Sequence, residues 1–194
     1  VRINPQIVGK VWRDSLMFAY NGNPVSARVY CLGTSLPDDK TLRVCNWNMR
    51  WFGEPQMCNC DTAVAKDHAR MILTDLQADV YCLQEVVSLA QLNFLTAALG
   101  PNYQSVVSTY CSGVTNVNDP YYVGCQKLAF IYNTQKLQNL GNYGLLSSTY
   151  PADTSAYYCF GSGRFPYLMK AKLLLANGIY DTLIFVDLHG KAYD

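Results

Sequence analysis

Four polar side chains stand at the ends of apolar, strand-like runs: Asn48, Glu85, Arg164 and His189. A carboxylate at a strand end is a hard oxygen ligand of the kind that Mg²⁺ prefers. An amide and a guanidinium can hold phosphate oxygens, and an imidazole can donate to a phosphoryl oxygen or transfer a proton. Because functional residues collect at strand ends in α/β folds, we expect these four side chains to lie together.

Each of the four residues also has an ordinary structural explanation. Glu85 could be a solvated surface residue, and Asn48 could begin a turn. Arg164 could pair with an exposed carboxylate for little free energy, and His189 could be a satisfied loop histidine. Taken singly, these explanations are favoured, whereas the order and context of the residues along the chain favour a shared site.

The strands that would position these side chains follow from runs and alternation of apolar residues. We expect strands at residues 42–48, 80–84, 103–109, 128–132, 167–175 and 182–188. Asn177-Gly178 between the last two strands is typical of a β-hairpin. The pattern predicts a mixed α/β fold with helices outside two sheets packed face to face.

Two helices are expected between the early strands. One is capped by Asp61 and extends to about Gln77, and its buried stripe is predicted to be formed by residues four apart: Val64, His68, Ile72 and Leu76. The other begins after Ser88, ends at Gly100-Pro101 and carries leucines on one side.

Residues 1–40 are expected to be an N-terminal extension or linker, and residues 41–194 a separate domain portion. The extension contains strand-like pieces at Gln6–Trp12 and Ala27–Leu32, followed by a linker or turn at Ser35–Lys40.

The bulk composition indicates a globular chain without a strong electrostatic field. Half of the 194 residues are hydrophobic, 15% are charged and the net charge is +1. A phosphate-bearing substrate therefore has to be held by a local site rather than by a basic surface. We expect no transmembrane segment, and a secretory leader that is absent or already removed.

Eight cysteines bear on the cellular compartment. Cys45 and Cys82 lie in strand-like runs and are expected to be buried small hydrophobes. The other six lie in or beside polar loops, which favours disulfides in an exported protein, with a Cys111–Cys125 bridge among the options. A zinc site is disfavoured because Cys58-Asn59-Cys60 is too tight and no histidine pair follows.

Five segments, in this order, resemble the endonuclease/exonuclease/phosphatase superfamily, and the run from Asn48 to Phe52-Gly53-Glu54 is especially similar to deoxyribonuclease I. The segments span residues 42–54, 78–86, 127–133, 164–167 and 185–192. The resemblance implies a four-layer α/β sandwich of the deoxyribonuclease I type, present here as its N-terminal half.

The resemblance also implies an activity: divalent-metal-dependent phosphoester hydrolysis. Glu85 and Asn48 are then expected to bind Mg²⁺, with Mn²⁺ or Ca²⁺ as alternatives. His189, Asn48 and Arg164 are expected to be catalytic, and Arg50, Arg164 and Tyr132 to contact substrate.

The sequence departs from the family pattern in two ways. The family's later Asp-x-Asn segment and final His segment are not found before Asp194, so a C-terminal half of the same domain is the expected partner. Gln126 stands where deoxyribonuclease I has the glutamate that pairs with its histidine, and a glutamine supplies no charge to stabilise an imidazolium.

Three functions compete on this sequence. A secreted, periplasmic or cell-surface nuclease is favoured by Phe52-Gly53-Glu54 and the loop cysteines. A phosphatase or phospholipase acting on an inositol phosphate or sphingomyelin is favoured by the near-neutral charge and Gln126. A non-catalytic fragment or binding module is the third possibility.

His68, the other histidine, is expected to pack at the edge of the core, and the many loop tyrosines could stack on bases or pack against a partner.

Overall fold

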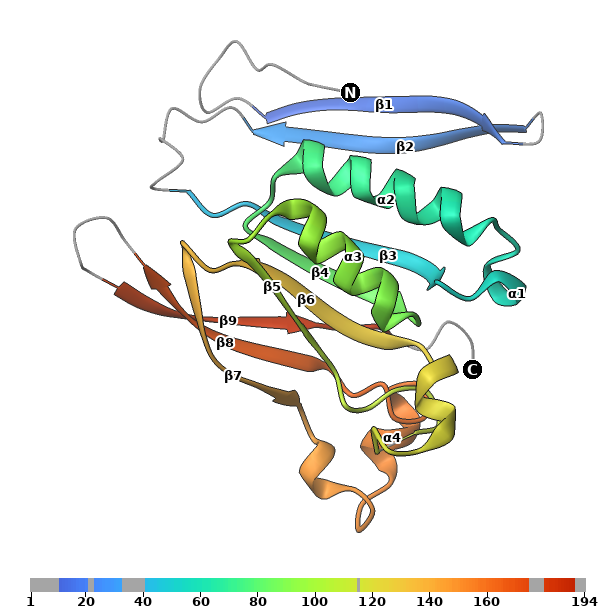
Figure 1. Cartoon of the computed structure of the whole chain (residues 1–194), viewed down its shortest axis with the longest axis vertical. Coiled ribbons are helices and arrows are strands. Elements are labelled where there is room, and N and C mark those ends of the chain that lie inside the picture. Colours follow the sequence, from blue (N-terminus) through green and yellow to red (C-terminus); the bar gives the residue numbers. More distant parts are fainter. Residues whose placement is uncertain (1–10, 21–22, 33–40, 115, 175–179, 191–194) are drawn as a thin grey trace. The chain divides into compact units, whose positions relative to one another are not determined.

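The computed structural model describes residues 11–20, 23–32, 41–114, 116–174 and 180–190 (Figure 1). The chain divides into two compact units, residues 1–41 and residues 42–194. Each unit is described by itself.

The first unit contains an antiparallel hairpin of two ten-residue strands, β1 (Val11–Tyr20) and β2 (Asn23–Leu32). The strand expected at Ala27–Leu32 forms the second half of β2. Of the piece expected at Gln6–Trp12, only the last two residues are described, and they begin β1. The expected linker at Ser35–Lys40 lies outside the described residues.

The second unit contains two sheets. The first has the strand order β3-β4-β6-β5, formed by β3 (Val44–Phe52), β4 (Val80–Val86), β6 (Lys127–Asn133) and β5 (Tyr103–Val107). β3 and β4 are parallel, and the other neighbours are antiparallel. The second sheet is antiparallel, with the order β7 (Leu137–Gly144), β8 (Tyr167–Leu174) and β9 (Tyr180–Asp187).

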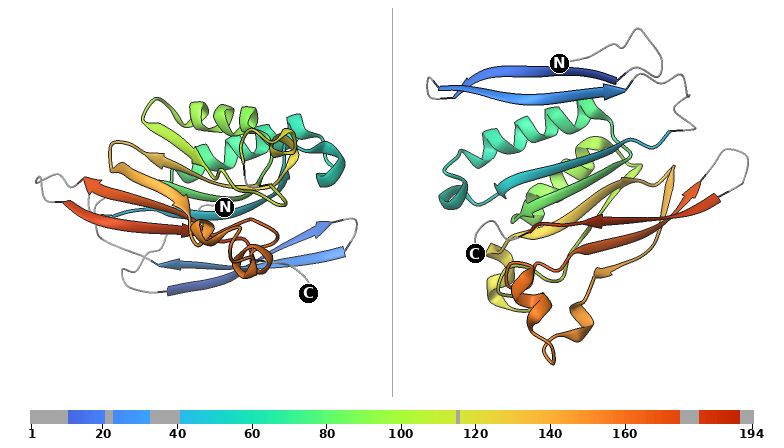
Figure 2. Two further views of the ribbon diagram at one scale, coloured as in Figure 1. Left: turned by 90° about the horizontal axis from the view of Figure 1, so that it is seen from below. Right: turned by 180° about the vertical axis from the view of Figure 1, so that it is seen from behind.

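Two helices cover one face of the first sheet (Figures 1 and 2). They are α2 (Thr62–Leu76) and α3 (Leu89–Leu99), and each begins directly after the residue whose side chain caps it, Asp61 and Ser88 respectively. Short helical turns lie in the connections: α1 (Pro55–Cys58), η2 (Pro120–Gly124), η3 (Ser147–Thr149) and α4 (Ser155–Cys159).

Two hydrophobic cores lie on opposite faces of the first sheet. One packs Leu73 of α2 and Leu92 of α3 against Leu83 of β4. The other packs Phe130 of β6 against Met169 of β8, between the two sheets. The described layers are therefore helix, sheet and sheet, which confirms the expected α/β arrangement with two sheets face to face.

The structure corrects the expected buried stripe of α2. Val64, Ile72 and Leu76 are each between 44% and 50% exposed, and His68 is also exposed. The buried residues of α2 are Ala69 and Leu73 instead. The helix bounds were predicted well because caps set them. The stripe was wrong because an i, i+4 row does not by itself tell which side of a helix meets the sheet.

The structure assigns the disulfide pairing of cysteines within the described residues. Cys111 pairs with Cys125, as one of the expected options, and Cys58 pairs with Cys60. Cys82 is buried and Cys45 is half-buried, and both are free thiols. No helix among the described residues is both long and apolar enough to cross a membrane.

Candidate active site

Both sheets bring their chemically distinctive side chains to one end. Asn48 pairs with Gln84 in the parallel β3–β4 pair, and Gln84 directly precedes Glu85 in the sequence. β6 starts at Lys127, which pairs with Val86, so the residue before it lies at the same end. Tyr167 at the start of β8 pairs with Asp187 at the end of β9, which places the neighbouring Arg164 and His189 there as well.

The carboxylate of Glu85 lies at the centre of the site and is surrounded by donors. Its Oε1 accepts from Asn48 Nδ2 at 2.8 Å, and its Oε2 accepts from the Trp51 backbone N–H at 3.0 Å and from Gln126 Nε2 at 2.7 Å. His189 Nε2 lies 3.4 Å from Oε1. The backbone of Glu85 has φ of +59°, a conformation that costs free energy in a non-glycine residue and is typical of functional positions.

Gln126 joins the two charged groups of the site. Its Oε1 accepts from Arg164 Nη1 at 2.8 Å, while its Nε2 donates to Glu85. Because a guanidinium only donates and a carboxylate only accepts, the two ends of this amide can be assigned without ambiguity. The sequence identified Gln126 only as a departure from the family pattern and did not predict this bridging position.

The same logic fixes the proton on His189. Arg164 Nη1 lies 2.8 Å from His189 Nδ1, so Nδ1 must accept and the proton of the neutral ring is on Nε2. Burial and the neighbouring Arg164 lower the pKa of His189, and Glu85 opposes this shift. The ring is therefore held neutral, with its N–H directed toward Glu85.

Arg164 is held by the loop that precedes β8. Its backbone N–H donates to Phe160 O at 2.8 Å. A Cβ on Gly161 would lie 2.3 Å from Arg164 Nη2, so a side chain at this position would displace the guanidinium from its place. Burial lowers the pKa of Arg164, and Glu85 opposes this shift. The buried Nε has no hydrogen-bond partner.

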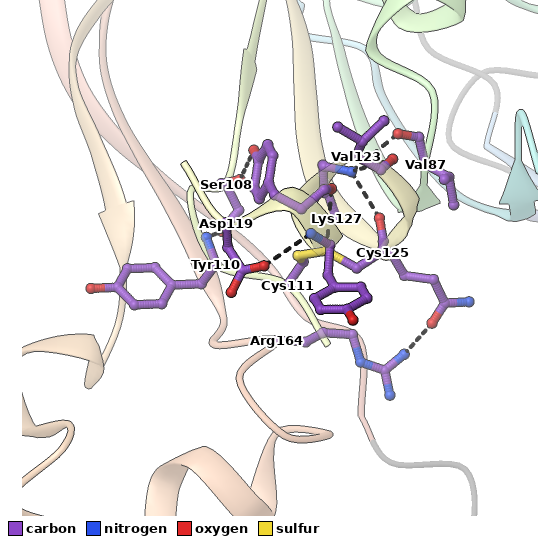
Figure 3. Close-up of a disulfide and its surroundings, with 12 residues drawn as sticks. Val87, Ser108, Tyr110, Cys111, Asp119, Val123, Cys125, Lys127 and Arg164 are labelled. Atoms are coloured by element: carbon purple, nitrogen blue, oxygen red, sulfur yellow. Dashed lines mark hydrogen bonds between the residues drawn. A yellow bond between two sulfur atoms is a disulfide. The ribbon is translucent and has the colours of Figure 1, made fainter. Parts of the chain in front are cut away.

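A buried lysine fixes the backbone on either side of the site (Figure 3). Lys127 Nζ donates to Val87 O at 3.1 Å and to Cys125 O at 2.8 Å, which joins the chain just after Glu85 to the chain just before Gln126. Burial lowers the pKa of Lys127 to about 8, so the ammonium form still dominates at neutral pH.

A second polar group lies behind the site. Gln84, next to Glu85, donates through Nε2 to Asp187 and to Asn46 Oδ1. Asp187 is 1% exposed, and its Oδ2 has no hydrogen-bond partner. Burial raises the pKa of Asp187 to about 6, despite the opposing hydrogen bonds from Gln84 and the Leu188 backbone.

The donor set fits a hydrated divalent cation in part. Within the described ranges, no cluster of three or more His, Cys, Asp or Glu side chains could hold a metal ion. Glu85 is one hard oxygen ligand, and Mg²⁺ needs few protein ligands because it keeps several waters. Asn48 Oδ1 accepts from the Arg50 backbone N–H at 2.9 Å and its Nδ2 donates to Glu85, and the expected role of Asn48 as a second ligand stays a prediction.

Two other expected site residues can now be placed. Tyr132 is buried, donates to Gln104 Oε1 and pairs with Val80 at the start of β4. It therefore lies at the opposite end of the sheet from Glu85, and the predicted substrate contact is wrong. Arg50 is exposed beside the site, with its backbone in the left-handed region at φ of +49°.

The Phe52-Gly53-Glu54 segment is explained by structure alone. Phe52 is buried in the core under the helices, and Glu54 caps α1. A Cβ on Gly53 would lie 2.2 Å from Ser88 Cβ. The segment therefore joins β3 to the start of α3 and says nothing about the substrate.

Comparison with solved structures identifies the fold. The chain is similar to an endonuclease/exonuclease/phosphatase family protein from Bacteroides thetaiotaomicron, with 17% identity, a TM-score of 0.53, and coverage of 75% of this chain and 48% of that one. It is also similar to a functionally unknown conserved protein from Enterococcus faecalis, with 18% identity, a TM-score of 0.52, and coverage of 74% and 51%. The chain thus spans about half the length of these structures. No family model and no curated protein matches the sequence.

Proposed function

We propose that this chain, which has the fold of the endonuclease/exonuclease/phosphatase family, provides part of the active site of a divalent-metal-dependent phosphoester hydrolase. The observation that carries the proposal is the network joining Glu85, Gln126, Arg164 and His189 at one end of both sheets. A structural salt bridge would not need a neutral imidazole and a bridging amide around one carboxylate.

Each member of the network has a distinct role in this proposal. Glu85 binds the divalent cation, and Asn48 and Gln126 orient its carboxylate. Arg164 and the Nε2 proton of His189 hold oxygens of the phosphate. When bound, Mg²⁺ supplies stabilisation of the charge that develops on the leaving oxygen.

The base and further metal ligands are proposed to come from the C-terminal half of the domain. The chain spans about half of the solved structures that it matches. In addition, Ile184 and Val186 of β9 and Leu188 directly after it are all exposed. An apolar sheet face of this kind suits a packed partner layer.

We also propose that the protein is exported. Two disulfides in the described part of the chain suit an oxidising compartment such as the cell exterior or the periplasm.

Hydrolysis of bis(p-nitrophenyl) phosphate, a soluble phosphodiester, by the protein that contains both halves of the domain tests the proposal directly. We expect turnover that needs Mg²⁺ or Mn²⁺ and is abolished by chelation. Glu85→Gln should lower kcat/KM by about a hundredfold or more, since it removes the charge that binds the metal.

The matched control is Glu54→Gln, because Glu54 is the chain's other glutamate and lies at the cap of α1. Equal activity in the two variants, or turnover that survives chelation, would overturn the proposal.

A further inference from the structure

Each of the two sheets carries a buried polar residue just before one of its site residues. Gln84 on β4 directly precedes Glu85, and Asp187 at the end of β9 lies two residues before His189. Gln84 is 4% exposed and Asp187 is 1% exposed. β4 and β9 belong to different sheets that pack face to face, so the two buried side chains meet between the sheets (Figures 1 and 2).

A hydrogen bond joins these two side chains from one sheet to the other. Gln84 Nε2 donates to Asp187 Oδ1, and the same nitrogen donates to Asn46 Oδ1 on β3 at 2.7 Å. Because a carboxylate accepts and does not donate, the orientation of the Gln84 amide is fixed. The bond therefore links the strand that carries Glu85 to the strand that leads into His189, directly behind the site.

The contact between Gln84 and Asp187 is not what stability alone would favour at this place. The core between the sheets is built from apolar side chains such as Phe130 and Met169. Asp187 Oδ2 finds no hydrogen-bond partner among the described residues. Replacing a buried polar pair by apolar side chains of the same shape is often neutral or stabilising, because a buried charge loses its hydration. The pair therefore calls for an explanation other than stability.

The spacing of the two sheets supplies that explanation. Glu85 belongs to the first sheet and His189 follows the second, so their separation depends on how the sheets are held. His189 Nε2 lies 3.4 Å from Glu85 Oε1, which is longer than an ordinary N–H···O hydrogen bond. Apolar packing is non-directional, whereas a hydrogen bond requires a distance and an angle. The bond behind the site therefore restricts the separation more strictly than the apolar core does.

We propose that Asp187 is a positioning residue, which acts through Gln84 to fix where His189 stands relative to Glu85. The inference rests on the proposed hydrolase function for its effect on turnover, whereas its effect on the site's geometry stands on the contact alone. Asp187 touches neither metal nor phosphate in this account. Its loss should therefore slow the chemical step without weakening the binding of substrate.

Kinetics of the protein that contains both halves of the domain test the effect on turnover. Asp187→Leu keeps the branching of the side chain and removes the acceptor. We expect kcat for bis(p-nitrophenyl) phosphate to fall by about ten- to a hundredfold with KM nearly unchanged, because small displacements of reacting groups are costly. Asp187→Asn keeps an oxygen that can accept from Gln84, and it should retain most of the kcat.

A double-mutant cycle separates the contact from the two residues that form it. Gln84→Met removes the donor, and Gln84→Met/Asp187→Leu should lower kcat no further than either substitution alone. The double variant should nevertheless be at least as stable to urea as each single variant, since neither buried partner is left without the other. Recovery of stability without recovery of kcat is what a positioning role predicts and a merely structural role does not.

The matched control is Asp79→Asn. Asp79 is also a buried carboxylate, but it precedes β4 at the end of that strand opposite Glu85, where it pairs with Lys136 at 3.0 Å. This substitution should lower the stability to urea and leave kcat as in the wild type. Urea unfolding also shows that each variant is folded under the conditions of the assay.

The ring signals of His189 in NMR spectra, recorded without metal or substrate, separate this inference from the proposed function. We expect Gln84→Met, a change on the other sheet, to shift these signals, and Asp79→Asn to leave them in place. Failure of the proposed function would appear as a wild type without metal-dependent turnover in which Gln84→Met still shifts the ring signals.

Four results would each overturn the positioning role. They are a kcat of Asp187→Leu equal to that of the wild type, an equal loss of kcat in Asp187→Asn, effects of the two substitutions that multiply in the double variant, and ring signals of His189 that Gln84→Met leaves unmoved.

Discussion

Gln126 carries no charge, yet its amide joins the carboxylate and the guanidinium of the site. Gln126→Met preserves the approximate shape and removes both hydrogen bonds, which leaves Glu85 and Arg164 each short of a partner. We expect the free energy of unfolding to fall by about 1–3 kcal/mol, because polar groups that are largely removed from water lose bonds to charged partners. Urea denaturation measures the change.

Gln135→Met is the control for that substitution, since Gln135 is exposed. It should change stability by less than about 0.5 kcal/mol. Equal effects of the two substitutions would mean that the bridge contributes nothing to the fold of the site.

Asp187 makes stability depend on pH. Its pKa in the folded chain is raised to about 6, above its value in the unfolded chain, so the folded state binds the proton more tightly. The contribution of this group to stability is present in full below about pH 4 and is lost as pH rises through about 6.

Asp187→Asn should remove that dependence. The free energy of unfolding of the variant minus that of the wild type is expected to be about 2–3 kcal/mol larger at pH 7 than at pH 4. Thermal or urea unfolding at the two pH values measures the difference, with Asp67→Asn on the exposed side of α2 as control. A constant difference between Asp187→Asn and wild type across this range contradicts the assignment.

At the residue level, the sequence predicted which side chains converge but not how they are paired. Asn48, Glu85, Arg164 and His189 were found because each ends or precedes an apolar strand. The position of Tyr132 and the contacts of Gln126 could not be predicted in the same way. Tyr132 was misplaced because antiparallel pairing turns its end of β6 away from Glu85. The bridging contacts of Gln126 depend on two segments 41 and 38 residues distant.

Among the elements, the junction between β3, α1 and α3 depends on one glycine. Gly53 has φ of +92° and no space for a Cβ beside Ser88. Gly53→Ala should therefore lower the free energy of unfolding by about 2–4 kcal/mol, from backbone strain and forced movement of the N-cap of α3. Gly124→Ala is the control, because open space surrounds Gly124. If both substitutions are neutral, the contact at Gly53 is not the constraint described above.

The disulfide between Cys111 and Cys125 orders the loop before Gln126. Replacing both cysteines by serine should lower the free energy of unfolding by about 2–4 kcal/mol, because the bridge restricts a long loop in the unfolded chain. The pair Cys58→Ser/Cys60→Ser should cost much less, since it spans two residues instead of fourteen. A larger loss from the shorter bridge would contradict this ordering.

The elements show where local patterns suffice. The caps Asp61 and Ser88 set the starts of α2 and α3 as predicted. β7 was missed because Gly141 and Gly144 lower its strand propensity and an irregularity in pairing interrupts its alternation. The sequence could not show that these residues join β8, since the pairing is a contact between separate segments.

For the whole molecule, the layered fold was predicted from five ordered motifs, and the solved structures with the same fold agree with that prediction. The composition predicted that a phosphate would have to be held by a local site, since the net charge is only +1. The sequence could not show that Tyr121 is exposed and the adjacent Tyr122 is buried, because tertiary packing decides the exposure of each.

Paramagnetic broadening by Mn²⁺ in NMR spectra tests the central claim, that Glu85 binds a divalent cation at this site. The chain has two histidines, so their ring signals report on two places. His189 lies 3.4 Å from Glu85, and His68 is exposed on α2. We predict that substoichiometric Mn²⁺ broadens the His189 signals and spares those of His68, and that Glu85→Gln abolishes the effect while Glu54→Gln does not. Equal broadening of both histidines, no broadening of either, or an unchanged response in Glu85→Gln would contradict the account.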